Sequence, residues 1–157
     1  MGRNIPSLFF KMNFVVDSRE KRSYEMYFSK LNYPYTVKKL EIGDYSILGY
    51  EDRFSVERKS LADFINCITQ DRDRFKKELQ RASSLDYFAV LVECSFFDIQ
   101  NRNYKSKIHP SSILGTIFKW SVKYSIPFFF VETHTGGAVA FIKLSEAYLK
   151  YKVYKHE

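Results

Sequence analysis

The segment Tyr87–Cys94 (YFAVLVEC) constrains the fold more than any other part of the chain. It has the length of a β-strand and is apolar on both of the faces that alternating side chains would form. Such a strand must be covered on both sides, as in sheets that carry helices on both faces. Because amphipathic helical segments flank it, we predict an α/β fold, a three-layer α/β/α sandwich with a central mixed β-sheet.

Periodicity and turn residues divide the rest of the chain into strands and helices. The expected strands are residues 13–17, 35–40, 45–48, 53–59, 87–94 and 127–131. The expected helices are residues 21–31, 60–68, 71–83, 109–124 and 138–153, with Gly136-Gly137 leading into the last. The three short strands between 35 and 59 suit a hairpin or meander, and the polar stretch 100–107 suits an exposed loop.

Length and composition predict one soluble domain. The 157 residues suffice for a single domain, 1–157, with its core at about residues 12–150. No run approaches the roughly 18 apolar residues of a membrane-spanning helix, and the N-terminus has no apolar run of secretory length, so we expect an intracellular protein with no membrane partner. Cys67 and Cys94 lie in apolar runs and are expected to be reduced core residues.

The formal charge of +7 indicates an anionic partner, of which nucleic acid is the commonest. Charge alone does not identify that partner, because many basic proteins bind no particular anion. The nature of the partner therefore depends on the chemistry of a site.

The segment FSVERKSLADF carries the chemistry of a metal-dependent nuclease. On a strand, side chains alternate, so Glu57 and Lys59 point to one face and Arg58 to the other. A carboxylate can hold Mg²⁺, and a neighbouring ammonium can orient the attacking water or neutralise the charge that gathers on the phosphate. Asp44, at the turn between two preceding strands, can supply a second carboxylate if those strands are neighbours in the sheet.

Each of these residues also has a purely structural interpretation. A Glu-Arg-Lys run is often a solvated strand end, and Gly43-Asp44 is ordinary turn chemistry. Ser60 fits a helix N-cap with Asp63 three positions later, where a carboxylate favours the positive end of the helix dipole. Order and spacing, more than any single residue, favour the functional interpretation.

The order and spacing resemble the nuclease motif of the XPF family of structure-specific DNA endonucleases. The motif stands here as Gly43-Asp44, twelve residues, Glu57-Arg58-Lys59, three residues and Asp63. The resemblance extends to FVVDSRE, DRFKKELQRA and YFAVLVE, the last bringing Glu93, and covers residues from about 12 to 150. The stretch IHPSSILGTIFKWSVKYSIPFFFV is similar to stand-alone versions from phages and mobile elements. The motif lies in the expected strand–turn–strand–helix context.

The resemblance implies a fold like that of restriction endonucleases and a dependence on Mg²⁺ or Mn²⁺. It implies that Asp44 and Glu57 are metal ligands and that Lys59 is the catalytic lysine. Two further carboxylates at the rim of the acidic cluster would support the metal or a second ion, namely Asp17 and Glu20. The remaining signature residues would pair with each other or buttress the site, namely Arg58 and Asp63.

Basic side chains outside the motif are candidates for contacts with DNA phosphates. The resemblance suggests Arg19 and Arg74, and spacing on the helix from Asp71 groups Arg74 with Lys77 and Arg81. The loop 101–107 adds Arg102, Lys105 and Lys107, with Tyr104 as a candidate for base stacking. His109 and His134 are expected to be loop or capping residues rather than general bases.

Two departures from the family limit what can be transferred. Its well-known members carry a helix-hairpin-helix domain after the nuclease, and some a helicase domain; neither is expected here, so a targeting protein could replace them. Family nuclease domains also associate through later helices, which suggests a homodimer through Phe141, Leu144, Tyr148 and Tyr151, continuing to Tyr154. The alternative is that this stripe packs on the sheet.

Three functions remain open at this point. The first is a Mg²⁺-dependent endodeoxyribonuclease, a hydrolase of phosphodiester bonds in branched, flapped or single-strand-containing DNA. The second is a non-catalytic DNA-binding partner subunit with a nuclease-like fold. The third is a structural protein whose basic surface serves protein partners. DNA repair, DNA recombination, replication and phage DNA processing are all compatible pathways.

Overall fold

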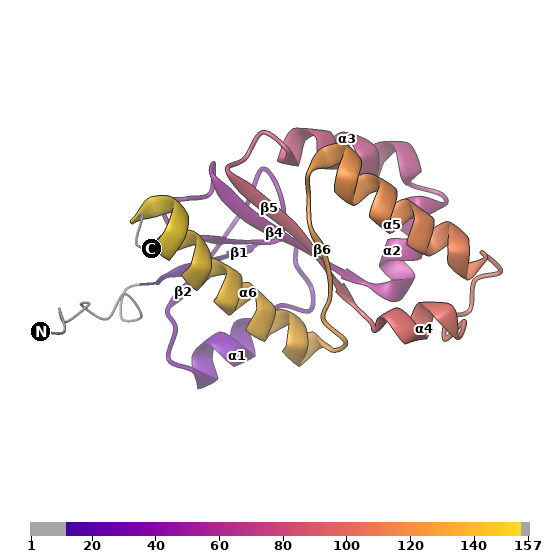
Figure 1. The fold of residues 1–157 in the computed structure, drawn as a ribbon. Helices are drawn as coiled ribbons and strands as arrows, with labels where there is room; N and C mark the ends of the chain where they lie inside the picture. The colour runs from indigo at the N-terminus through magenta and orange to yellow at the C-terminus, as the bar shows by residue number, and fades with distance from the viewer. Residues whose placement is uncertain (1–11, 155–157) are drawn as a thin grey trace, which may run out of the picture.

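The computed structural model describes residues 12–154, which fold around a six-stranded sheet (Figure 1). The sheet has the order β2-β1-β3-β4-β5-β6. The strands are β1 Phe14–Asp17, β2 Tyr35–Lys38, β3 Tyr45–Ile47, β4 Phe54–Ser60, β5 Tyr87–Glu93 and β6 Phe128–Phe130. The helices are α1 Glu25–Lys30, α2 Leu61–Ile68, α3 Arg72–Ala82, α4 Phe96–Gln100, α5 Pro110–Tyr124 and α6 His134–Tyr148, followed by a π-helical segment, η2, Leu149–Val153.

Helices cover both faces of the sheet, which confirms the predicted α/β/α sandwich (Figure 1). On one face α1 and α6 enclose an aromatic cluster around Phe141, whose ring lies 4.9 Å from Phe14 and 5.5 Å from Tyr45, centroid to centroid. On the other face α2, α3 and α5 enclose a cluster around Trp120. Strand β5 contributes to both, since Leu91 faces the first cluster and its two neighbours the second.

Strand direction brings the ends of several strands to one edge of the sheet. Strand β3 is antiparallel to both β1 and β4, and β4 is parallel to β5. Strands β1, β4 and β5 therefore run in the same direction, and their carboxyl ends meet. Asp17, the Glu57–Lys59 segment and Glu93 lie at these ends, and Asp44 immediately precedes β3 at the same edge.

Of the hairpin or meander expected between residues 35 and 59, the hairpin is confirmed and the meander is wrong. Strands β3 and β4 do form an antiparallel pair. Strand β2, however, pairs in parallel with β1 at the edge of the sheet. The chain leaves β1, passes through α1 and returns as a parallel neighbour, so β1–α1–β2 is a crossover unit rather than the first arm of a hairpin.

The helices also differ from the sequence-based expectation, and α1 begins at Glu25 instead of residue 21. Helix α6 begins at His134 instead of Ala138, so Gly136 and Gly137 lie within its first turn. A Cβ on Gly137 would come within 2.1 Å of the Tyr24 hydroxyl, so glycine permits close packing there instead of breaking the helix. The short helix α4 was not expected; it begins with a capping box between Ser95 and Asp98.

The stripe proposed for association is mostly part of the core. Phe141 and Tyr148 are buried against the sheet, as the packing alternative predicted, and Leu144 is partly buried. Tyr151 and Tyr154 are about half exposed. Cys67 and Cys94 are buried free thiols, as expected. In the span 12–154 no helix combines the length and apolar character needed to cross a bilayer.

Phe141→Ala should lower the free energy of unfolding by about 3–5 kcal/mol, because it removes a fully buried ring from the centre of one core. Phe118→Ala is the matched control: this α5 side chain is 55% exposed, and its loss should change the free energy by no more than about 0.5 kcal/mol. Urea unfolding measures both. Equal losses in the two variants would contradict the assignment of Phe141 to the core.

Candidate active site

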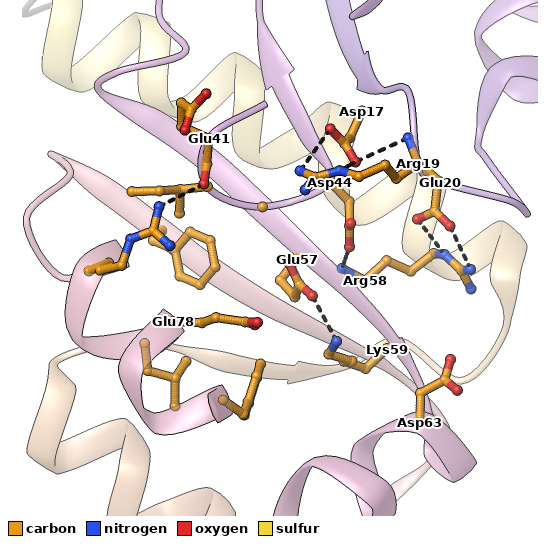
Figure 2. Close-up of a pocket in the computed structure, with 16 residues that line it drawn as sticks. Asp17, Arg19, Glu20, Glu41, Asp44, Glu57, Arg58, Lys59, Asp63 and Glu78 are labelled. Carbon is orange, nitrogen blue, oxygen red and sulfur yellow. Dashed lines mark hydrogen bonds and ion pairs between the residues drawn. The ribbon is translucent and has the colours of Figure 1, made fainter. Parts of the chain in front are cut away.

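A cavity of about 370 Å³ opens where the carboxyl ends of β1 and β4 meet the start of β3. All the residues of the recognised motif line it, together with residues of the loop after β1 and of α3 (Figure 2). These motif residues are Gly43, Asp44, Glu57, Arg58, Lys59 and Asp63. The structure thus brings together side chains that lie up to 20 positions apart within the motif.

The turn before β3 places Asp44. Gly43 has a φ of +78°, and a Cβ there would lie 2.1 Å from the Ser55 hydroxyl, so only glycine fits without strain. The Asp44 amide donates to the Val56 carbonyl (2.9 Å), and the Asp44 carbonyl accepts from the Asp17 amide (2.8 Å). The Asp44 carboxylate accepts a hydrogen bond from the Arg58 amide at 2.8 Å. Backbone contacts to two strands therefore aim this carboxylate into the cavity.

Glu57 and Lys59 lie on the same side of β4, as strand alternation predicted. Lys59 Nζ lies 2.8 Å from Glu57 Oε1 (Figure 2). The side chains are 13% and 17% exposed, so the pair is largely shielded from solvent but still reaches the cavity.

Burial makes the cavity electrostatically unfavourable for two ionised carboxylates. Burial, and secondly the charge of Glu57, raise the pKa of Asp44 well above its usual value. Burial also raises the pKa of Glu57, although Lys59 opposes the shift. The pKa of Lys59 is raised despite its burial, because Glu57 stabilises the ammonium. The site therefore holds negative charge that a bound cation would offset.

Asp44 and Glu57 have the chemistry of a two-carboxylate ligand set. Within residues 12–154 no group of three or more His, Cys, Asp or Glu side chains is arranged to hold a metal. Mg²⁺, however, keeps several waters and commonly uses one or two carboxylates together with substrate phosphates. Asp44 Oδ1 and Glu57 Oε2 accept no hydrogen bond from the described residues, so one oxygen of each carboxylate is free for a cation.

Asp17 and Glu20 line the same cavity but are held by arginines. Asp17 accepts hydrogen bonds from the Leu40 amide (2.8 Å) and from Arg19 Nε (2.9 Å). Although burial alone would raise it, these bonds keep the pKa of Asp17 below its usual value. Both Glu20 oxygens accept from Arg58, at 3.0 and 3.1 Å. A role of Asp17 and Glu20 in metal binding stays a prediction, and their observed contacts are structural.

Arg58 lies at the centre of an ion network that includes three residues from outside the motif, namely Glu20, Glu93 and His134. Its guanidinium binds Glu20 and Glu93, and the side chains of all three are about 10% exposed or less. Glu93 in turn lies 3.0 Å from His134 Nδ1. Of the two expectations for Arg58 and Asp63, pairing with each other is wrong, because Arg58 pairs with Glu20 and Glu93 instead, while buttressing of the site stays a prediction. The expectation that His134 is a loop or capping residue is also wrong, since His134 belongs to this network.

Asp63 and His109 have the structural roles that the sequence suggested. Asp63 lies in the first turn of α2, where its amide donates to the N-cap hydroxyl of Ser60 at 3.1 Å. Its carboxylate also lines the cavity, so both interpretations of Asp63 remain compatible with its position. His109 is the N-cap of α5 and accepts a hydrogen bond from the Ser111 amide.

The predicted phosphate-binding residues are divided by the fold. Arg19 and Arg81 lie on the cavity wall, and Arg81 donates to the Glu41 carbonyl at 3.1 Å. The others lie on exposed surfaces and are not part of that wall, namely Arg74, Lys77, Arg102, Lys105 and Lys107. Arg74 is 70% exposed and pairs with Asp71 at 3.2 Å. Tyr104, proposed for base stacking, packs against the core and donates to the Ile108 carbonyl.

Comparison with known proteins places this geometry in a family. The family model described as the ERCC4 domain matches residues 16–139. The chain is 28% identical over 135 residues to a Methanocaldococcus jannaschii protein described as an ATP-dependent RNA helicase. The matched region covers 86% of this chain and 15% of that protein.

Solved structures of XPF from Aeropyrum pernix share the fold. One superposes with a TM-score of 0.71 at 23% identity and covers 86% of this chain and 64% of that chain. A second, in complex with DNA, has a TM-score of 0.70 at 22% identity and covers 89% of this chain and 66% of that chain. The chain thus spans less than two thirds of the length of each of these relatives.

Asp44→Asn should raise the free energy of unfolding when divalent cations are absent. The folded-state pKa of Asp44 lies above its usual value of 3.8. Between pH 3.8 and the raised pKa, the free energy of unfolding therefore falls as the pH rises, because the carboxyl group ionises more readily in the unfolded chain. Asparagine can still accept the Arg58 amide hydrogen bond without the charge. Urea unfolding from about pH 4 to pH 8 should show the advantage of the variant widening as pH rises.

Divalent cations should narrow this difference in stability between the variant and the parent. Mg²⁺ at a free concentration ten times its dissociation constant should stabilise the parent by about 1.4 kcal/mol and the variant by less. Equal stabilisation of both proteins would contradict a ligand role for Asp44.

Proposed function

Since the chain belongs to the ERCC4 domain family, we propose that it is a metal-dependent DNA endonuclease that hydrolyses phosphodiester bonds. The observation that carries the proposal is the convergence of Asp44, Glu57 and Lys59 in one cavity. Two buried carboxylates with raised pKa values face a lysine that is paired with one of them. Such an arrangement costs stability, which is common where a site is built for catalysis.

Asp44 and Glu57 would hold Mg²⁺ or Mn²⁺. When bound, the cation supplies Lewis-acid activation of the phosphate and of the attacking water. The hydrogen bond from the Arg58 main-chain amide would keep the Asp44 carboxylate oriented toward the proposed cation site. The ion pair with Lys59 orients Glu57 in the same way.

Lys59 would act as a fixed positive charge rather than as a general base. Its raised pKa keeps it protonated at neutral pH, so it cannot take a proton from water there. An ammonium at the cavity wall instead stabilises the negative charge that gathers on the phosphate oxygens as the bond to the leaving oxygen breaks. The proton of the attacking water would pass to solvent or to a phosphate oxygen.

The substrate that we propose is branched, flapped or single-strand-containing DNA inside the cell, in repair or recombination. The formal charge of +7, with Arg19 and Arg81 at the cavity, suits the phosphate backbone. One of the structural relatives is in complex with DNA. We also propose a homodimer or a separate targeting protein as a source of additional DNA contacts.

Asp44→Asn and Lys59→Ala should each abolish cleavage while leaving DNA affinity largely unchanged, because both residues act on the reacting phosphate. The assay uses labelled duplex, flap, fork and Holliday-junction DNA with Mg²⁺, Mn²⁺ or EDTA. Lys119→Ala, an exposed lysine on α5, is the matched control and should cut at the parent rate. Variants that cut as fast as the parent would refute the mechanism. Binding without cleavage under every condition would instead support a non-catalytic DNA-binding subunit.

Arg81→Ala should weaken DNA binding without regard to sequence and reduce the slope of log K against log salt by about 1, as expected for the loss of one phosphate contact. Fluorescence anisotropy in EDTA between about 50 and 200 mM salt measures this slope. An unchanged slope would remove Arg81 from the DNA interface. Binding that does not respond to salt at all would favour a protein partner.

A further inference from the structure

His134 lies between two hydrogen-bond acceptors that come from distant parts of the chain. It occupies the first position of α6, and its side chain is 24% exposed. Its Nδ1 is 3.0 Å from Glu93 Oε2, at the end of β5. Its Nε2 is 3.3 Å from the main-chain carbonyl of Ser23, just before α1.

These two contacts constrain which ring nitrogens donate. The Ser23 carbonyl oxygen can only accept, and the Glu93 carboxyl group is ion-paired with the Arg58 guanidinium. Both contacts are hydrogen bonds at the same time when both ring nitrogens carry a proton, as in an imidazolium. The rings of Tyr24 and Tyr27 lie 4.9 and 5.8 Å from the imidazole, centroid to centroid, and aromatic neighbours favour a cation.

A doubly protonated His134 would complete an alternating series of charges with Glu20, Arg58 and Glu93. Without His134 the two carboxylates would exceed the single guanidinium by one negative charge. The first three side chains are about 10% exposed or less, and an uncompensated charge at that depth is costly. With His134 protonated, the series is neutral.

The main chain of Arg58 connects this series to Asp44, one of the two proposed metal ligands. The Arg58 side chain is fixed by Glu20 and Glu93, while its amide orients Asp44 at 2.8 Å. We propose that His134 is a positioning residue of the nuclease site, which acts through Glu93 and Arg58 on the orientation of Asp44. This inference rests on the proposed function.

The protonation of His134 can be tested without any cleavage assay. A long-range ¹H–¹⁵N spectrum of the parent protein at neutral pH should show both nitrogens of one histidine ring at imidazolium shifts, and that signal should disappear in His134→Gln. A ring with one protonated nitrogen would overturn the assignment of two donated hydrogen bonds.

The positioning role predicts a specific pattern in kinetics and metal binding. His134→Gln should lower kcat and weaken Mn²⁺ binding, each about tenfold, as is typical when a supporting partner of a metal site is lost. The KM for DNA should stay within twofold of the parent value, because His134 does not line the cavity. The matched control His109→Gln, a cap residue on α5, should leave kcat and Mn²⁺ affinity unchanged.

A double-mutant cycle identifies the route of the effect. If His134 acts through Glu93, the variant carrying both Glu93→Gln and His134→Gln should lose no more activity than Glu93→Gln alone. Losses that multiply, or His134→Gln cutting at the parent rate, would overturn the proposal. A parent that binds Mn²⁺ but cuts no DNA would overturn the proposed function alone, while the spectrum and the Mn²⁺ affinity of His134→Gln would still decide the role of His134.

Discussion

The parallel pairing of β4 with β5 is the contact on which the rest of the molecule depends. The two strands are in register from Phe54 opposite Tyr87 to Ser60 opposite Glu93. They lie inside the sheet, where β5 contributes side chains to the apolar clusters on both faces and β4 to the cluster under α1 and α6. Because the register is continuous, the carboxyl end of β4 must lie beside that of β5, and Arg58 comes within reach of Glu93.

That arrangement places two sets of charged side chains on opposite sides of β4. One side of β4 directs Glu57 and Lys59 to the cavity, where two carboxylates remain under electrostatic strain. The other side directs Arg58 into a network in which acids and bases alternate. The first set would be offset by an additional cation, as the proposed function requires, and the second pairs each acidic group with a basic one. A rigid, satisfied network next to an unsatisfied pair is the organisation expected of a preorganised site.

Local pattern was sufficient where the relevant neighbours are close in sequence. Strand alternation predicted the common side of Glu57 and Lys59, and capping preferences predicted the start of α2 at Ser60 and the role of His109. Local pattern failed where the deciding contact joins residues that are far apart in the sequence. The pairing of β2 with β1 and the early start of α6 depend on packing that no local pattern reports. Gly137 illustrates this, because glycine is needed there to leave room for the hydroxyl of Tyr24, which lies more than a hundred positions earlier in the chain.

The amino-acid sequence by itself determined the layered α/β fold and the motif from Gly43 to Asp63. Apolar periodicity specifies which faces must be buried, and the spacing of acidic and basic residues along one strand specifies which side chains share a face. Only the tertiary structure decided that Arg58 pairs with Glu20 and Glu93 instead of Asp63, and that His134 joins them. The physical reason is that buried charges take as partners whatever the fold brings within hydrogen-bonding distance, and strand order, not sequence separation, sets that distance.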